Sequence, residues 1–190
     1  IHFSTDYVFD GEKEEAYVET DPTRPLGVYG QSKCAGEEAI QEAGGQNYIF
    51  RTSWVYSTIG QNFFVTIKRL SQEREELKVV ADQVGVPTSN QFIAEQIQQI
   101  IPQLNNNNTG VYHLVPGGSC SWHEFAKAII GQTNLQFNFE NLHAIETNEF
   151  PTKTKRPKNS ILNNAKIKQI FNLDLNDWQD CLSQIIVEEK

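Results

Sequence analysis

The chain has 190 residues and a formal net charge of −8, and 38% of its residues are hydrophobic. This length predicts one large domain, or one domain with a small lobe, and the composition predicts a buried core rather than disorder. The acidic balance argues against nucleic acids and acidic membranes as partners, because such a surface repels phosphate. No apolar run approaches the roughly 20 residues of a membrane-spanning helix.

The predicted elements alternate between strands and helices. A strand ends near Ser4, a turn-rich loop follows, and a helix at 29–43 is stopped by a pair of glycines. The following elements are a strand at 48–50, a helix at 62–76, a strand at 77–80, a helix at 90–101, a strand at 111–115, a helix capped by Ser121 and Glu124, a strand at 142–146, and helices near 164–171 and 176–187. This alternation predicts an α/β protein with a mostly parallel sheet.

The start of the chain and its cysteines give further expectations. The sequence has no methionine and opens inside an apolar stretch, so we expect a C-terminal fragment of a longer protein. The glycine-rich GxGxxG signature of dinucleotide-binding folds is absent. Three dispersed cysteines without CxxC spacing, and no visible signal peptide, predict reduced thiols and a cytoplasmic location. No histidine or cysteine spacing predicts a metal site.

Tyr29 and Lys33 are the first candidate catalytic residues. Four residues apart on a helix, they share one face. A nearby ammonium stabilises a phenolate, so this phenol could donate a proton to a carbonyl oxygen while hydride reaches the carbon. The spacing alone is common on solvated helix faces. Upstream, Thr5 follows a predicted strand, and hydroxyls at the carboxyl end of a parallel strand face the ligand crevice. The other interpretation of Ser4 and Thr5 is an ordinary turn, with Asp6 making a local backbone bond.

Several short motifs strengthen this interpretation. They are STDYVFDG, YGQSK, RTSWVY, GQNFF, DQVGVPTS, GVYHL, SW-x-x-FA and RPKNS, and they keep their order over nearly the whole chain. In combination they resemble the dTDP-4-dehydrorhamnose reductases, which are extended short-chain dehydrogenases/reductases. The resemblance implies part of a Rossmann-like doubly wound parallel sheet plus a smaller C-terminal α/β lobe that binds substrate. Residues 1–60 would belong to the NAD(P)-binding domain, and 61–190 mainly to the lobe, with one or more segments returning to that domain.

The resemblance also implies roles for individual residues. Tyr29, Lys33 and Thr5 would be catalytic, and Lys33 with Tyr29 would also contact the cofactor. The substrate-binding residues would be Thr5, Asp6, Tyr7, Trp54, Arg156 and Asn159. By itself, a tryptophan after a strand is typical of core packing. Arg156 lies in a loop rich in lysine and proline at 151–160, and arginine suits the pyrophosphate of a nucleotide sugar. A solvated charged loop is the other interpretation of its lysines.

The implied activity is NAD(P)H-dependent reduction of the C4 ketone of dTDP-4-dehydro-6-deoxy-L-mannose to dTDP-L-rhamnose. The resemblance does not decide between NADPH and NADH. It also allows a homodimer and a Mg²⁺ ion, although no clear metal site is visible in the sequence.

Two alternatives stay open. A nucleotide-sugar dehydratase or epimerase of the same superfamily is one, but dehydratases typically carry an acidic residue where this chain has Tyr7. A non-catalytic subunit resembling the regulatory subunit of methionine adenosyltransferase is the other, and the intact set of Thr5, Tyr29 and Lys33 argues against it.

Overall fold

A small parallel sheet is the centre of one of the two halves of the molecule. The computed structural model describes residues 1–134, 136–152 and 154–188. Strands β1 (His2–Thr5), β2 (Tyr48–Thr52) and β7 (Gly110–His113) pair in the order β1-β2-β7, and both pairings are parallel. Every residue of β2 is buried, as expected for the central strand of a sheet covered on both faces. The register places Thr5 beside Thr52, so the two strands end together.

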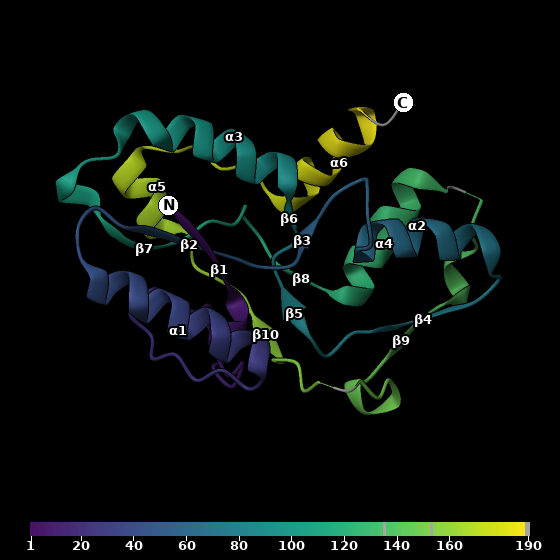
Figure 1. Ribbon diagram of the computed structural model, residues 1–190. Coiled ribbons are helices and arrows are strands. Elements are labelled where there is room, and N and C mark those ends of the chain that lie inside the picture. Colours follow the sequence, from purple (N-terminus) through teal and green to yellow (C-terminus); the bar gives the residue numbers. More distant parts are fainter. Residues whose placement is uncertain (135, 153, 189–190) are drawn as a thin grey trace.

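Helices cover both faces of this sheet (Figure 1). Helix α1 (Val28–Ala43) lies on one face, and α3 (Asn90–Ile100) and α5 (Ala165–Phe171) lie on the other. Phe50 and Tyr112 of the sheet form a hydrophobic core with side chains from α3 and α5. These side chains are Phe92, Ile100, Ile167 and Phe171. The arrangement confirms the predicted α/β class and the Rossmann-like winding.

A buried ion pair fastens α1 to the sheet. The Arg51 guanidinium on β2 donates from Nε to Glu37 Oε1 at 2.9 Å and from one terminal nitrogen to Oε2 at 2.5 Å. Both side chains are almost fully buried. Burying two charges is costly unless the pair is well bonded, and this two-pronged geometry meets that requirement. The pair therefore fixes the rotation of the helix whose first turn carries the candidate catalytic tyrosine.

The second lobe is built on another parallel pair, β4 (Leu77–Val80) with β9 (Leu142–Ile145). Helices α2 (Phe63–Glu73), α4 (Trp122–Thr133) and α6 (Trp178–Glu188) accompany it. The core of this lobe includes Phe64, Ile67, Phe125, Ile129 and Leu182. Asn62 caps α2 by accepting a hydrogen bond from the Val65 N–H, and Ser121 with Glu124 forms the predicted capping box on α4.

Short strands connect the two halves. β3 (Val55–Tyr56) pairs with β6 (Thr88–Ser89), and β5 (Val84–Gly85) lies between β10 (Asn159–Ser160) and β8 (Cys120–Ser121). These two-residue strands were not predicted from the sequence, because two residues are too few to show a hydrophobic period. The 3₁₀ helices are η1 (Asp6–Val8), η2 (Ile101–Gln103), η3 (Asn106–Asn108), η4 (Phe139–Asn141) and η5 (Thr147–Glu149).

Most predicted elements are confirmed, with shifted ends. The helix expected at 62–76 spans Phe63–Glu73, and the strand expected at 111–115 is Gly110–His113. The strand expected at 48–50 continues to Thr52. All three cysteines are free and buried, as predicted. The boundary between a cofactor domain at 1–60 and a lobe at 61–190 stays a prediction.

Candidate active site

Thr5 ends β1 at the edge of the sheet where the parallel strands finish. It has extended backbone angles and caps η1, since its Oγ1 accepts a hydrogen bond from the Tyr7 N–H at 3.2 Å. The same hydroxyl donates to Asp6 Oδ1 at 2.9 Å. Ligands of open α/β sheets bind beyond the carboxyl ends of the strands, so Thr5 occupies the expected place for a substrate contact.

The Asp6 carboxylate lies beneath this edge and is only 4% exposed. Its Oδ2 has no hydrogen-bond partner of ordinary geometry among the described residues. Burial raises the pKa of Asp6 to about 6, and the nearby hydroxyls of Ser160, Thr5 and Ser53 offset part of that rise. Asp6 therefore sits behind Thr5. Its predicted contact with substrate stays a prediction.

Tyr29 is the second residue of α1 and lies across from Tyr7. The two rings meet edge to face with centroids 5.9 Å apart. Gly30 allows this approach, because a Cβ on Gly30 would overlap the carbonyl oxygen of Tyr7. Tyr29 is 54% exposed, so its phenol is accessible at the sheet edge.

Lys33 lies one helical turn after Tyr29 and points back to the first strand. Its Nζ donates to the carbonyl oxygen of Phe3 at 3.2 Å. An ammonium has three donors, so two remain for other partners. Sequence spacing predicted the shared face, and the contact with β1 fixes where that face points.

Trp54 lies just beyond β2 in the left-handed region, with a φ of 46°. Its indole stacks on Trp122, with centroids 3.5 Å apart and planes within 9°. The indole also rests against Gly85, where a Cβ would overlap it. Trp122 rather than Trp54 lines the adjacent groove. The predicted contact of Trp54 with a sugar stays a prediction.

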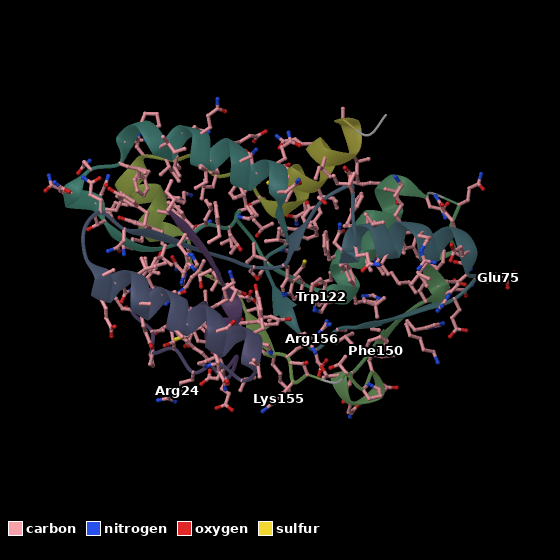
Figure 2. The ribbon with its side chains drawn as sticks, in the orientation of Figure 1. Arg24, Glu75, Trp122, Phe150, Lys155 and Arg156 are labelled. Atoms are coloured by element: carbon pink, nitrogen blue, oxygen red, sulfur yellow. The ribbon has the colours of Figure 1, made fainter. Side chains whose placement is uncertain are left out.

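An open groove of about 740 Å³ runs along the second lobe. Its walls include Phe63 and Trp122 on one side, β4 on another, and Phe150 and Arg156 at its rim. Figure 2 shows Trp122, Arg156 and Phe150 grouped close to the junction of the lobes. Arg156 is exposed, and no carboxylate among the described residues forms an ion pair with it. Aromatic faces beside a free guanidinium suit a flat ring attached to an anion.

The loop that carries Arg156 connects this groove to the tyrosines. Thr154, Lys155 and Pro157 border a small pocket that also includes Tyr7 and Tyr29. The positive charge of Arg156 also acts on the Tyr7 phenol, where it partly offsets the rise in pKa that burial causes. Lys153 of the same loop lies outside the described residues.

Asn159 holds this loop in place. Its side-chain amide donates to the backbone carbonyls of Lys13 and Glu15 at 2.7 and 2.9 Å, and its Oδ1 accepts from the Ile161 N–H. Its polar atoms are thus occupied within the fold. The proposed contact of Asn159 with substrate stays a prediction.

The structure therefore brings Thr5, Asp6, Tyr7, Tyr29 and Lys33 together at one edge. Arg156 approaches from the loop, while Trp54 is set back behind Trp122. Sequence reasoning did not single out Trp122, Phe63 and Phe150, although the first two stand in recognised motifs. Side-chain type alone could not show that they share one groove.

Across residues 1–134, 136–152 and 154–188, no group of three or more histidine, cysteine, aspartate or glutamate side chains is arranged to hold a metal ion. Among the same residues, none of the helices has the length and apolarity needed to cross a bilayer.

A doubly wound parallel sheet with a tyrosine and a lysine four residues apart at its carboxyl edge is the fold of the short-chain dehydrogenases/reductases. The chain belongs to the RmlD substrate binding domain family, which matches residues 1–190.

Two curated relatives and one solved structure illustrate the similarity. The dTDP-4-dehydrorhamnose reductase of Shigella flexneri is 44% identical over 99% of this chain and 64% of its own length. That of Escherichia coli strain K12 is 42% identical, with the same coverage of 99% and 64%. The Bacillus anthracis dTDP-4-dehydrorhamnose reductase, solved in complex with NADP, is 38% identical and superposes with a TM-score of 0.90 over 98% of this chain and 64% of that one. The chain thus spans less than two thirds of its relatives.

Proposed function

We propose that this chain contributes the catalytic tyrosine and the substrate site of an NAD(P)H-dependent dTDP-4-dehydrorhamnose reductase. The main support is the convergence of Thr5, Tyr29 and Lys33 at the carboxyl edge of the sheet, beside a groove that ends at Arg156. The names of the relatives supply the substrate class. The reaction would convert dTDP-4-dehydro-6-deoxy-L-mannose to dTDP-L-rhamnose.

Tyr29 would act as the general acid. Its exposed phenol would donate a proton to the oxygen on C4 of the keto sugar, so that an O–H bond forms as the carbonyl π bond breaks. Thr5 would bond the same oxygen from the end of β1. The helix that carries Tyr29 is bonded to the strand that carries Thr5 through Lys33 and the Phe3 carbonyl, which would help to keep the reacting oxygen in one position.

The residues present also fit a nicotinamide cofactor. Lys33 is anchored to β1 by one donor and keeps two for a ribose hydroxyl, next to the accessible Tyr29. When bound, NADPH or NADH supplies the hydride for C4. The NADP in the Bacillus anthracis relative supports NADPH.

The nucleotide part of the substrate would occupy the groove of the second lobe. Phe63 and Trp122 would pack against the base, and the exposed Arg156 guanidinium would bond the pyrophosphate. We also propose a cytoplasmic location and a homodimer. Neither a dehydratase nor a non-catalytic subunit gains support from a particular contact in the site.

The direct test replaces Tyr29 with phenylalanine in the protein carried to the full length of its relatives, called the full-length protein below. We expect turnover of a dTDP-4-keto sugar to fall by about 10²–10⁴, with little change in substrate affinity, because only the transferable proton is lost. Tyr48→Phe is the matched control. The Tyr48 hydroxyl donates to the Asn105 carbonyl, and Tyr48 lies at the end of β2 opposite to the candidate site. Near-normal turnover of Tyr29→Phe would refute the assignment.

A second measurement addresses the alternatives. Net oxidation of NADPH with loss of the ketone supports reduction, whereas formation of a 4-keto product without net oxidation indicates a dehydratase. Recovery of a stoichiometric synthetase partner from an inactive full-length protein would indicate a regulatory subunit.

A further inference from the structure

The hydroxyl of Thr5 has one proton and two possible directions in which to donate it. In the structure it donates to Asp6 Oδ1 at 2.9 Å and accepts from the Tyr7 N–H at 3.2 Å. A hydroxyl has two acceptor sites, so the remaining site can face the substrate only as an acceptor. A ketone oxygen accepts hydrogen bonds and cannot donate one. In this state Thr5 cannot stabilise the ketone.

Protonation of Asp6 would reverse this bond. The neutral carboxylic acid could donate its own proton to Thr5 Oγ1, which would then hold the Tyr7 N–H and the acid proton on its two acceptor sites. The Thr5 proton would be free to point out of the sheet edge toward the ketone oxygen. No side chain has to move, because the two oxygen atoms are already within hydrogen-bond distance.

We propose that Asp6 is a positioning residue whose protonation state decides whether the Thr5 hydroxyl donates to the substrate or to Asp6. The proposal rests on the proposed reductase function and adds a role for Asp6 behind the reacting oxygen. It stands on the burial of Asp6, the 2.9 Å contact to Thr5, and an Oδ2 that lacks a hydrogen bond of ordinary geometry among the described residues. Protonated Asp6 favours ketone reduction, and ionised Asp6 favours binding of the alcohol product.

The surroundings of Asp6 suit such a change. Burial raises its pKa to about 6, which brings its titration close to neutrality. Besides Thr5, the hydroxyls of Ser160, on β10, and Ser53, after β2, partly offset this rise in the pKa of Asp6. Ser53 itself donates to the Ser160 carbonyl at 3.2 Å, so this layer is fixed by the junction of the two halves.

The titratable groups around Asp6 belong to three elements. Tyr7 follows it on η1, and the negative charge of Asp6 adds to the rise in the Tyr7 pKa that burial causes. Tyr29 from α1 and Arg156 from the loop face Tyr7 from outside. Lys33 of α1 is bonded to the Phe3 carbonyl instead. The pH test therefore has to separate Asp6 from these groups.

The test compares kcat/KM for ketone reduction in the full-length protein and in its Thr5→Val variant from about pH 5 to about pH 8. Dividing kcat/KM of the first by kcat/KM of the second cancels the pH dependence of every group that acts equally in both proteins, including Tyr29 and Lys33. We expect the ratio to be about 10²–10³ at the acid end, the usual effect of one donor to a developing oxyanion. It should fall toward one as pH rises through the titration of Asp6.

Asp6→Asn provides the matched comparison, because an amide keeps the shape but cannot ionise. The ratio of Asp6→Asn to the Thr5→Val/Asp6→Asn double variant should not change with pH. A wild-type ratio that is constant with pH would overturn the proposal, and so would a ratio that still falls with pH in the Asp6→Asn background. Asp174→Asn, at an exposed carboxylate on the loop between α5 and α6, controls for lost charge and should reproduce the wild-type ratio.

A spectroscopic measurement keeps the proposal testable without reductase activity. The carboxyl carbon of Asp6 is followed by ¹³C NMR in the full-length protein. Thr5→Val should raise the pKa of Asp6, because the hydroxyl donated to the ionised form. Thr52→Val, which removes the neighbouring buried hydroxyl that bonds the Ser4 carbonyl, should leave it unchanged. An unchanged titration in Thr5→Val would overturn the coupling, whereas lack of ketone reduction would refute only the proposed function.

Discussion

The buried pair of Arg51 and Glu37 gives the sharpest prediction about stability. In Glu37→Gln the carboxylate that accepts from Nε at 2.9 and 3.2 Å and from a terminal nitrogen at 2.5 Å becomes neutral. The guanidinium would then be an unbalanced charge on a side chain that is 5% exposed. One of its terminal nitrogens already has no partner among the described residues.

Breaking one side of a buried ion pair costs about 3–5 kcal/mol. A domain is stable by only about 5–15 kcal/mol, so this loss is a large fraction of the total. For a chain of this size each kcal/mol lowers Tm by about 2–4 °C, which gives a fall of about 6–20 °C. The substitution acts on the attachment of α1 to β2, and hence on the element that carries Tyr29.

Urea unfolding of the full-length protein measures this change, provided that the transition is two-state. Glu42→Gln is the control, because it makes the same chemical change at an exposed position of the same helix. Replacing both partners with apolar residues, in Glu37→Leu/Arg51→Met, should recover much of the loss. If Glu37→Gln costs no more than Glu42→Gln, the pair does not hold the helix and the reasoning fails.

Three further predictions follow from the packing. Gly30→Ala should destabilise the fold and reduce turnover, because the new Cβ would overlap the Tyr7 carbonyl; unchanged melting would contradict the close approach. Burial and the Arg51 charge hold the pKa of His113 near 3, so its ring should stay neutral in NMR titrations down to about pH 4. Because the unfolded histidine binds a proton below about pH 6.5, His113 should reduce stability as pH falls from there toward 3, and a His113→Gln variant should lose that slope in urea unfolding. Trp122→Ala should expose the Trp54 indole and shift its fluorescence to the red, while weakening nucleotide-sugar binding by about 1–3 kcal/mol; unaltered emission would refute the stacking.

The sequence alone determined the class of fold and pointed to the candidate catalytic pair. Alternating apolar runs and helix caps predicted the main strands and helices, since these signals are local and repeat with a fixed period. Tyr29 and Lys33 were found because helical spacing puts residues four apart on one face. The ordered motifs then indicated the family that residues 1–190 match.

Only the tertiary structure decided which side chains meet. Three contacts are examples: the hydrogen bond from Lys33 to Phe3, the edge-to-face pair of Tyr7 and Tyr29, and the stack of Trp54 on Trp122. They join residues far apart in the sequence, so neither the helix period nor the strand period predicts them. Burial also distinguishes neighbours in sequence: the Asp6 carboxylate is enclosed and accepts a hydrogen bond from the Thr5 hydroxyl. Desolvation depends on the whole surrounding fold, and for that reason the shifted pKa of Asp6 could not be read from the chain.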